Sequence, residues 1–257
     1  MKLGRNRPAP IPRNMRLHLA DFVSASLPVP PVVSHYFQKA YQGVKKVNLN
    51  DRLGCCVISG AAHVRDVWQG NAGTAPPWID DATVEYLYEK IGGYDPDDPS
   101  TDQGCDEITA LRYFKQHGIS KDGSHKIIGW ASVNGANETL CKQAIYLFEN
   151  LYFGVELPDA WINPFPSKDG FVWGLAGEAN PENGHCFIGG GYNAVGVQID
   201  TWGLIGTLTW PAIKKYATTE GSGELYVLFS QDLILKATQK APNGFDAKQL
   251  GAALAQF

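Results

Sequence analysis

Two stretches of this chain combine residue types that could carry out nucleophilic chemistry. In the first, a polar turn that contains glycine leads into the adjacent Cys55 and Cys56, and small or apolar residues follow at helical spacing. This pattern predicts a buried helix that begins at the cysteines, where free backbone N–H groups and the helix dipole stabilise an anion. A thiol so placed tends to have a lowered pKa and a more reactive thiolate. The sequence therefore predicts a nucleophilic cysteine at a helix start.

The second stretch supplies a base and an acid. Two apolar, glycine-containing runs, 184–192 and 194–203, indicate a pair of antiparallel strands with their turn near Tyr192 and Asn193. His185 opens the first strand and Asp200 closes the second. Because residues at the outer ends of such a pair face one another across the ladder, we expect Asp200 to contact the His185 imidazole. Another histidine, His63, lies on the cysteine helix, and we expect it to point away from the cleft.

This layout resembles the papain-like cysteine peptidases, which have a nucleophile at a helix start and a histidine that opens a strand. Cys56 and His185 are 129 residues apart, at the lower edge of the separation found in that family, and Asp200 follows 15 residues after His185. The resemblance implies an α+β fold, in which a helical subdomain carrying the cysteine packs on an antiparallel sheet carrying the histidine and the aspartate. It also implies hydrolysis of a peptide or other amide through a thioester intermediate, without a metal or a cofactor.

A divergent bacterial and bacteriophage group of papain-like proteins is more similar still, because its cysteine motif reads Asn-Asp-x-x-Gly-x-Cys and its later strand ends in Thr-Trp-Gly. The matching residues here are Asn50, Asp51, Gly54, Cys56, Thr201, Trp202 and Gly203. The similarity extends over roughly residues 45 to 257. The chain departs from the wider family in having Val57 after the cysteine and Asp200 where asparagine is usual.

The resemblance also assigns the remaining site residues. Family members carry an oxyanion-hole glutamine six residues before the nucleophile. Counting back from Cys56 reaches Asn50, which has the same amide donor, whereas counting back from the neighbouring cysteine reaches a leucine. A glycine-bearing loop that lines the cleft corresponds to Asp102 and Gly104. Trp202 is assigned to the cleft as the residue that shields the histidine–aspartate pair from water.

Composition excludes several other classes of protein. The chain has 257 residues and a formal net charge of −4, which gives no reason to expect nucleic-acid binding. No apolar run approaches the roughly 20 residues needed to span a bilayer, and no signal peptide is evident. The five cysteines are an odd number without zinc-ligand spacing, which favours reduced thiols in a cytoplasmic protein.

Residues 1–33 differ from the domain expected over residues 34–257. They hold six prolines, five basic residues and one acidic residue, a composition that favours extended backbone. This arm is interpreted either as a disordered tail or as a segment that docks on a protein partner. The second interpretation leads to a competing hypothesis: a structural or assembly protein of a phage particle, associated with the virion, whose papain-like site is vestigial. A third hypothesis is a thiol redox protein that uses Cys55 and Cys56.

Periodicity and turn residues define the elements around these motifs. Helices are expected over 56–69, 80–91, 106–117, 138–148, 211–216 and 246–257, and further strands over 127–133, 152–157 and 225–229. A long loop over 158–180 carries aromatic residues that could form one wall of a cleft. Helices first and mainly antiparallel strands later form an α+β pattern.

Overall fold

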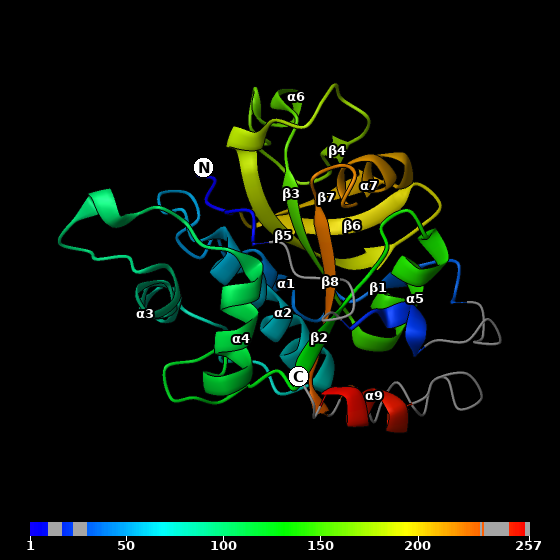
Figure 1. The fold of residues 1–257 in the computed structure, drawn as a ribbon, viewed down its shortest axis with the longest axis horizontal. Helices are drawn as coiled ribbons and strands as arrows, with labels where there is room; N and C mark the ends of the chain where they lie inside the picture. The colour runs from blue at the N-terminus through cyan, green and yellow to red at the C-terminus, as the bar shows by residue number, and fades with distance from the viewer. Residues whose placement is uncertain (10–16, 23–29, 232, 234–246, 255–257) are drawn as a thin grey trace.

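A large, mostly antiparallel sheet runs through the centre of the protein, as the computed structural model of Figure 1 shows. The structure describes residues 1–9, 17–22, 30–231, 233 and 247–254. Seven strands follow the order β2-β8-β3-β5-β6-β7-β4, and β1 pairs with the far end of β5. Their bounds are β1 Ser34–His35, β2 Gly129–Ser132, β3 Leu151–Glu156, β4 Val172–Trp173, β5 Gly184–Tyr192, β6 Gly196–Thr201, β7 Leu204–Thr209 and β8 Glu224–Phe229. Only the β4–β7 pair is parallel among these pairings of the described strands.

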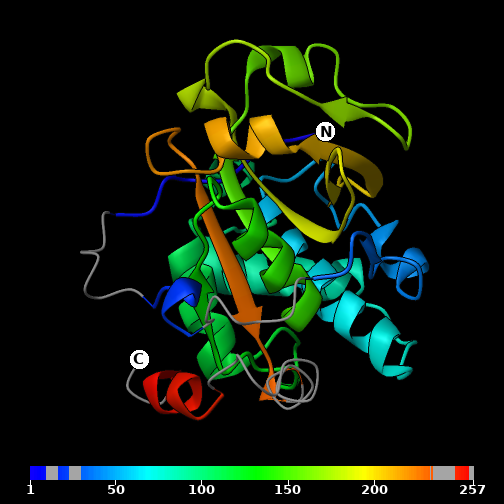
Figure 2. The same cartoon turned by 90° about the vertical axis from the view of Figure 1, so that its right-hand side faces the viewer.

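The helices form two groups on either side of this sheet (Figures 1 and 2). One group comprises α1 Tyr41–Val44, α2 Cys56–Ala72, α3 Asp81–Gly92 and α4 Glu107–His117, with the short η3 Pro99–Thr101. The others are α5 Glu138–Phe148, α6 Asp159–Ile162, α7 Trp210–Tyr216 and α9 Ala247–Leu254, with η2 Leu19–Asp21 and η4 Pro181–Asn183. Aspartate side chains cap α3 and α4, where Asp80 and Asp106 accept from backbone N–H groups of the first turn.

The sheet separates two hydrophobic cores, and β5 contributes to both. Phe187 packs into the core that contains α5 and α7, while Cys186 and Ile188 pack with α2 and α4. This division follows from the alternation of side chains along a strand. At Gly60 on α2, an added Cβ would lie only 3.1 Å from a ring carbon of Tyr152 and 3.4 Å from the Cys186 Sγ. Glycine at this position therefore lets the helix approach the strands closely.

The α+β class and the order of helices before strands are confirmed. The helix that begins at Cys56 runs to Ala72, three residues beyond its expected end, and Gly73 closes it with a φ of 76°. The helix over 138–148 has the expected bounds. The loop over 158–180 contains the short elements α6 and β4 rather than no regular structure. Residues 246 and 255–257 of the expected last helix lie outside the described residues. No described helix has the length and apolar character needed to cross a membrane.

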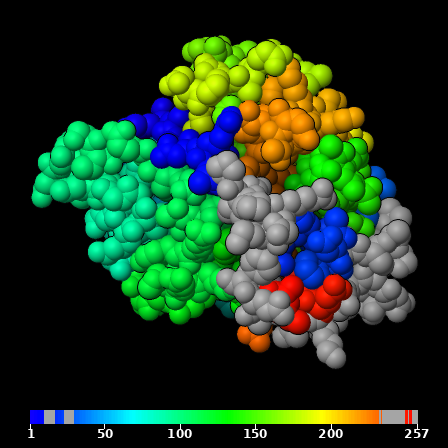
Figure 3. Space-filling view, in the orientation of Figure 1, coloured from blue at the N-terminus to red at the C-terminus, as the bar shows by residue number. Residues whose placement is uncertain are grey.

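The N-terminal residues lie in a groove between the two halves of the molecule. Figure 3 shows the dark blue atoms of the first residues between the helical lobe of α3 and α4 and the lobe that contains β5 and β6. Further along the same arm, Leu19 is fully buried in the core beside α5. The described parts of the arm thus pack on this chain itself. Residues 10–16 and 23–29 of the arm lie outside the described residues.

Candidate active site

Cys56 is the first residue of α2, and its thiol is buried. Burial raises the pKa of Cys56 to about 12, although a hydrogen bond from the Cys186 backbone acts in the opposite direction. The neighbouring Cys55 points elsewhere, because its Sγ donates to the Asn48 carbonyl at 3.4 Å. The helix start expected from the sequence is present, but in this state Cys56 is a protonated thiol.

His185 is fully buried near the start of β5. Its ring stacks on Trp202, with the centroids 4.2 Å apart, and its Nε2 lies 2.7 Å from the Thr201 Oγ1. Its Nδ1 has no hydrogen-bond partner among the described residues. Burial lowers the pKa of His185 to about 3, so the imidazole is neutral at physiological pH.

Asp200 does not face His185, and the expected contact between them was wrong. Asp200 is paired with Ile188 across the β5–β6 ladder, and Ile188 lies an odd number of residues from His185. The two side chains therefore project from opposite faces of the sheet. The cause is a bulge between Gly189 and Gly191, which shifts the register by one residue. Without this bulge, Asp200 would be opposite Gly189, on the same face as His185.

The partner of Asp200 is His63 on α2. The His63 Nδ1 lies 2.6 Å from the Asp200 Oδ2, and its Nε2 lies 2.9 Å from the Lys46 carbonyl oxygen. Burial lowers the pKa of His63, but the charge and hydrogen bond of Asp200, the charge of Asp66 and the Lys46 carbonyl together raise it, so the net pKa is raised. His63 thus faces Asp200 on β6, and the expectation that it points away from the cleft stays a prediction. The pKa of His63 is thus raised while that of His185 is lowered, and burial also raises the pKa of the partner Asp200.

The structure therefore does not join the expected catalytic residues into one cluster. Cys56 packs on the face of β5 that carries Cys186, whereas His185 packs on the face that carries Phe187. No hydrogen bond or ion pair connects Cys56 with His185 in the described part of the chain. Thr201, which the sequence marked only as part of the Thr-Trp-Gly motif, makes the contact to His185 that Asp200 was expected to make.

The expected oxyanion-hole residue and the expected cleft residues, in contrast, converge on the N-terminal segment. The Asn50 side-chain amide and the Trp202 indole N–H both donate to the Lys2 carbonyl, at 3.2 and 3.1 Å. Asp102 pairs with the Lys2 ammonium group. An added Cβ at Gly104 would lie 2.0 Å from the Gly4 carbonyl oxygen. These four residues line one groove, and residues 2–5 of the same chain occupy it.

Backbone hydrogen bonds hold this segment from both sides, as they hold a peptide added to a strand edge. The Gly4 and Arg5 N–H groups donate to the Gly184 carbonyl at 3.2 and 3.1 Å. On the opposite side, the Cys105 N–H donates to the Gly4 carbonyl at 3.0 Å, and the Asn6 N–H donates to the Cys105 carbonyl at 2.9 Å. Gly184 directly precedes His185, so the segment runs past the expected active site in an extended conformation.

Sequence reasoning missed the buried acidic pocket that receives Arg5. The Arg5 Nε donates to the Glu107 Oε1 at 2.8 Å, and the guanidinium lies 3.7 Å from the Glu224 carboxylate. The Arg5 side chain is 1% exposed and that of Glu107 is 0% exposed. Burial raises the pKa of Glu107 to about 7, and Arg5 acts in the opposite direction. An added Cβ at Gly154 would lie 1.7 Å from the Glu107 Oε1, so glycine there leaves room for the carboxylate.

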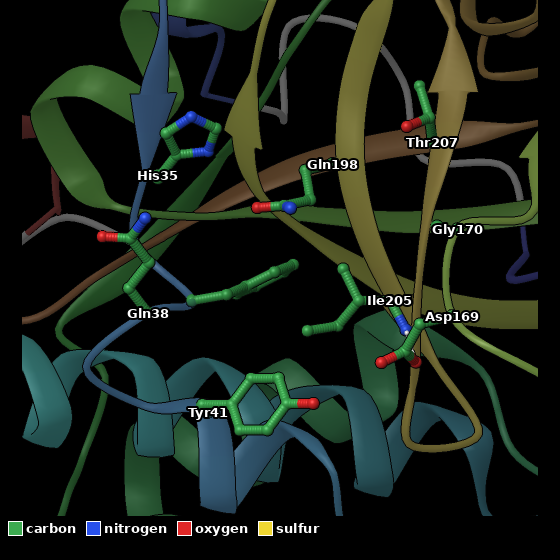
Figure 4. A pocket seen from close by; sticks show the side chains of 10 residues that line it. His35, Gln38, Tyr41, Asp169, Gly170, Gln198, Ile205 and Thr207 are labelled. Atoms are coloured by element: carbon green, nitrogen blue, oxygen red, sulfur yellow. Dashed lines mark hydrogen bonds between the residues drawn. The ribbon is translucent and has the colours of Figure 1, made fainter.

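A separate surface pocket of about 430 Å³ lies between the β1–α1 region and the β6–β7 hairpin (Figure 4). Its polar lining includes His35, Gln38, Asp169 and Gln198. None of the residues assigned to chemistry lines it. It is therefore distinct from the groove that holds the N-terminal segment.

The arrangement of helices and sheet is that of the papain-like cysteine proteases. Xylellain, a cysteine protease from Xylella fastidiosa, is 14% identical and has a TM-score of 0.58, over 89% of this chain and 97% of that chain. Digestive procathepsin L 3 from the larval midgut of Tenebrio molitor is 11% identical and has a TM-score of 0.59, over 85% and 75% of the two chains. The Carica candamarcensis cysteine protease CMS1MS2, solved with E-64, is 14% identical with a TM-score of 0.51, over 78% and 99%. A scan of protein-family models and a search of curated proteins found no match. The fold is therefore papain-like.

Proposed function

We propose that this protein is a papain-like cysteine hydrolase that cleaves a peptide or another amide, and that residues 2–7 keep its groove closed in the present state. The observation that carries the proposal is the groove itself. The resemblance assigned Asn50 to the oxyanion hole and Asp102, Gly104 and Trp202 to the substrate cleft, and all four contact an extended peptide segment. A groove that already binds peptide backbone beside Gly184 and His185 is suited to a peptide substrate.

In the proposed reaction, the Cys56 thiol transfers its proton to His185, and the thiolate attacks the carbonyl carbon of the substrate amide. The Asn50 amide and the Cys56 backbone N–H donate to the resulting oxyanion. The amine leaves with the proton from the imidazolium, and water then hydrolyses the thioester to release the acid. This reaction needs no cofactor. In the present β5–β6 register, the contact that orients His185 comes from Thr201.

Two structural changes are needed to convert the closed state into the reactive one. The N-terminal segment has to leave the groove, and the start of β5 has to move so that His185 reaches Cys56. We propose that the first change permits the second, because Gly184 accepts two hydrogen bonds from the segment and directly precedes His185.

The test is the rate of Cys56 alkylation by iodoacetamide as a function of pH, with peptide mapping by mass spectrometry to identify the thiol. Cys55→Ser removes the adjacent thiol from the measurement. In a full-length Gly4→Ala chain, whose segment no longer fits the groove, we expect alkylation to persist below about pH 7 and to be lost on adding His185→Ala. The wild type should show the same dependence at a lower rate, because the segment opens only transiently.

A second candidate is the assembly protein suggested by the arm, with a site that performs no chemistry. The observation that favours it is the separation of Cys56 and His185 onto two faces of β5, with a pKa of about 12 for the thiol and about 3 for the imidazole. For such a protein, Cys56 reacts only above about pH 8, as an ordinary thiol does, or not at all. That outcome in both chains would eliminate the hydrolase.

A further inference from the structure

In addition to its contacts with the peptide backbone, the groove restricts which residue can be bound at two positions of the segment. The first is at Gly4, where an added Cβ would lie 2.0 Å from the Gly54 carbonyl oxygen. Gly104 faces the same residue from the other wall, because its own added Cβ would lie 2.0 Å from the Gly4 carbonyl oxygen. The obstacle to a side chain at position 4 is the Gly54 backbone, which cannot rotate away as a side chain can, so only glycine fits there. The second close approach requires glycine at position 104 of the groove wall.

The second restricted position is that of Arg5, the next residue of the segment. Arg5 enters a closed pocket in which Glu107 accepts from its Nε and Glu224 adds a second negative charge. A carboxylate as deeply buried as Glu107 is costly without a cation, because burial removes its hydration. The planar guanidinium supplies both the charge and fixed N–H donors, which a lysine ammonium group does not match.

The flanking positions are less selective. Lys2 pairs with Asp102, but the Lys2 side chain is 43% exposed. Arg7 pairs with Glu156, and the Arg7 side chain is 57% exposed. Because the cation of each pair stays largely in contact with solvent, these pairs add less affinity than the fully buried one. They show that acidic groups lie at both ends of the groove and favour a basic peptide.

From these contacts we infer that the groove is a recognition site for peptides in which an arginine directly follows a glycine, and that the chain's own N-terminus is the intramolecular occupant of this site. A peptide of the form Lys-x-Gly-Arg from another molecule makes the same contacts when the segment is displaced. This inference rests on the proposed function, because it takes such peptides as the substrates of the proposed hydrolase. Because the N-terminal segment is covalently attached, it competes at an effective concentration on the order of millimolar.

The experiment measures binding of a fluorescent synthetic peptide with the sequence of residues 1–9 to the full-length Gly4→Ala chain, whose own segment is displaced. We expect saturable binding by fluorescence anisotropy. The matched peptide with alanine in place of Gly4 should bind at least about tenfold more weakly. A peptide with citrulline in place of Arg5 keeps the shape without the charge and should bind on the order of 100-fold more weakly. Glu107→Gln in the receptor should reduce the difference between arginine and citrulline.

A second measurement does not depend on the folding of any variant. In the wild type, excess spin-labelled peptide should broaden the indole N–H resonance of Trp202, which contacts Lys2, and the alanine-containing peptide should not. Absence of binding in both formats, or equal binding of the glycine and alanine peptides, overturns the inference. Binding with an inert Cys56 would leave the recognition site standing and remove the hydrolase. A reactive Cys56 together with equal binding of the two peptides would support the hydrolase and remove the recognition site.

Discussion

Acidification is expected to destabilise this protein through His185. Burial lowers the pKa of His185 from its ordinary value of 6.5 to about 3. As the pH falls below 6.5, the unfolded chain binds a proton at this residue that the folded chain excludes. The free energy of unfolding therefore decreases with falling pH, and the decrease ends near pH 3, where the folded state also binds the proton. At 1.36 kcal/mol per pKa unit, the full effect is about 5 kcal/mol, and about 3 kcal/mol is lost by about pH 4.

His185→Phe isolates this effect, because it keeps an aromatic ring to stack on Trp202 and removes the titrating group. The variant loses the hydrogen bond to Thr201, which costs about 1 kcal/mol at every pH. Urea denaturation at about pH 7 and about pH 4 gives the free energy of unfolding of both proteins. At about pH 7 we expect the wild type to have the larger free energy of unfolding of the two proteins. At about pH 4 we expect His185→Phe to have the larger one.

The control is His117→Phe at an exposed position, which should retain the pH dependence of the wild type. Contributions from the carboxylates and from the His63–Asp200 pair are common to the wild type and the variant and cancel in the difference. A stability difference between wild type and His185→Phe that is the same at both pH values would refute the assignment of His185 as a buried neutral imidazole.

Two further predictions concern the groove and the bulge. Arg5→Ala leaves the buried Glu107 carboxylate without its cation and should cost about 3–5 kcal/mol in urea denaturation at about pH 8. Lys142→Ala breaks a partly exposed helical pair and the cation–π contacts with Tyr192 and Trp210, and it should cost under about 1.5 kcal/mol. Equal losses would show that the Arg5 pair contributes no more than a surface pair. Gly190→Ala places a Cβ 2.2 Å from a ring carbon of Phe37 and should cost about 1–3 kcal/mol. Its cost should fall in a Phe37→Leu background, and additive costs in a double-mutant cycle would contradict this explanation of the bulge.

The local features of the site were determined by the sequence alone. Small apolar residues after the cysteines specify a buried helix, and it begins at Cys56. The glycine-rich apolar runs specify β5 and β6, with His185 and Asp200 near their outer ends. Each of these features depends on residues that are close together in the chain, so their pattern is visible in the sequence.

Tertiary packing decided how these parts face one another. Phe37 fills the space in which a Cβ at Gly190 would lie, and the bulge beside it changes the face on which Asp200 projects. A one-residue shift reverses every side chain of a strand, and a glycine run leaves its own register weakly specified. The pairing of Asp200 with His63 follows from that shift.

The occupant of the groove was also decided only in three dimensions. The contacts of Arg5 with Glu107 and of Lys2 with Asp102 each join residues about 100 positions apart, and no local pattern connects them. The proline-containing and basic composition of the arm indicated extended backbone but not its binding site. The sequence thus indicated four residues of the groove, Asn50, Asp102, Gly104 and Trp202, while the fold determined its acidic pocket and placed the chain's own N-terminus in it.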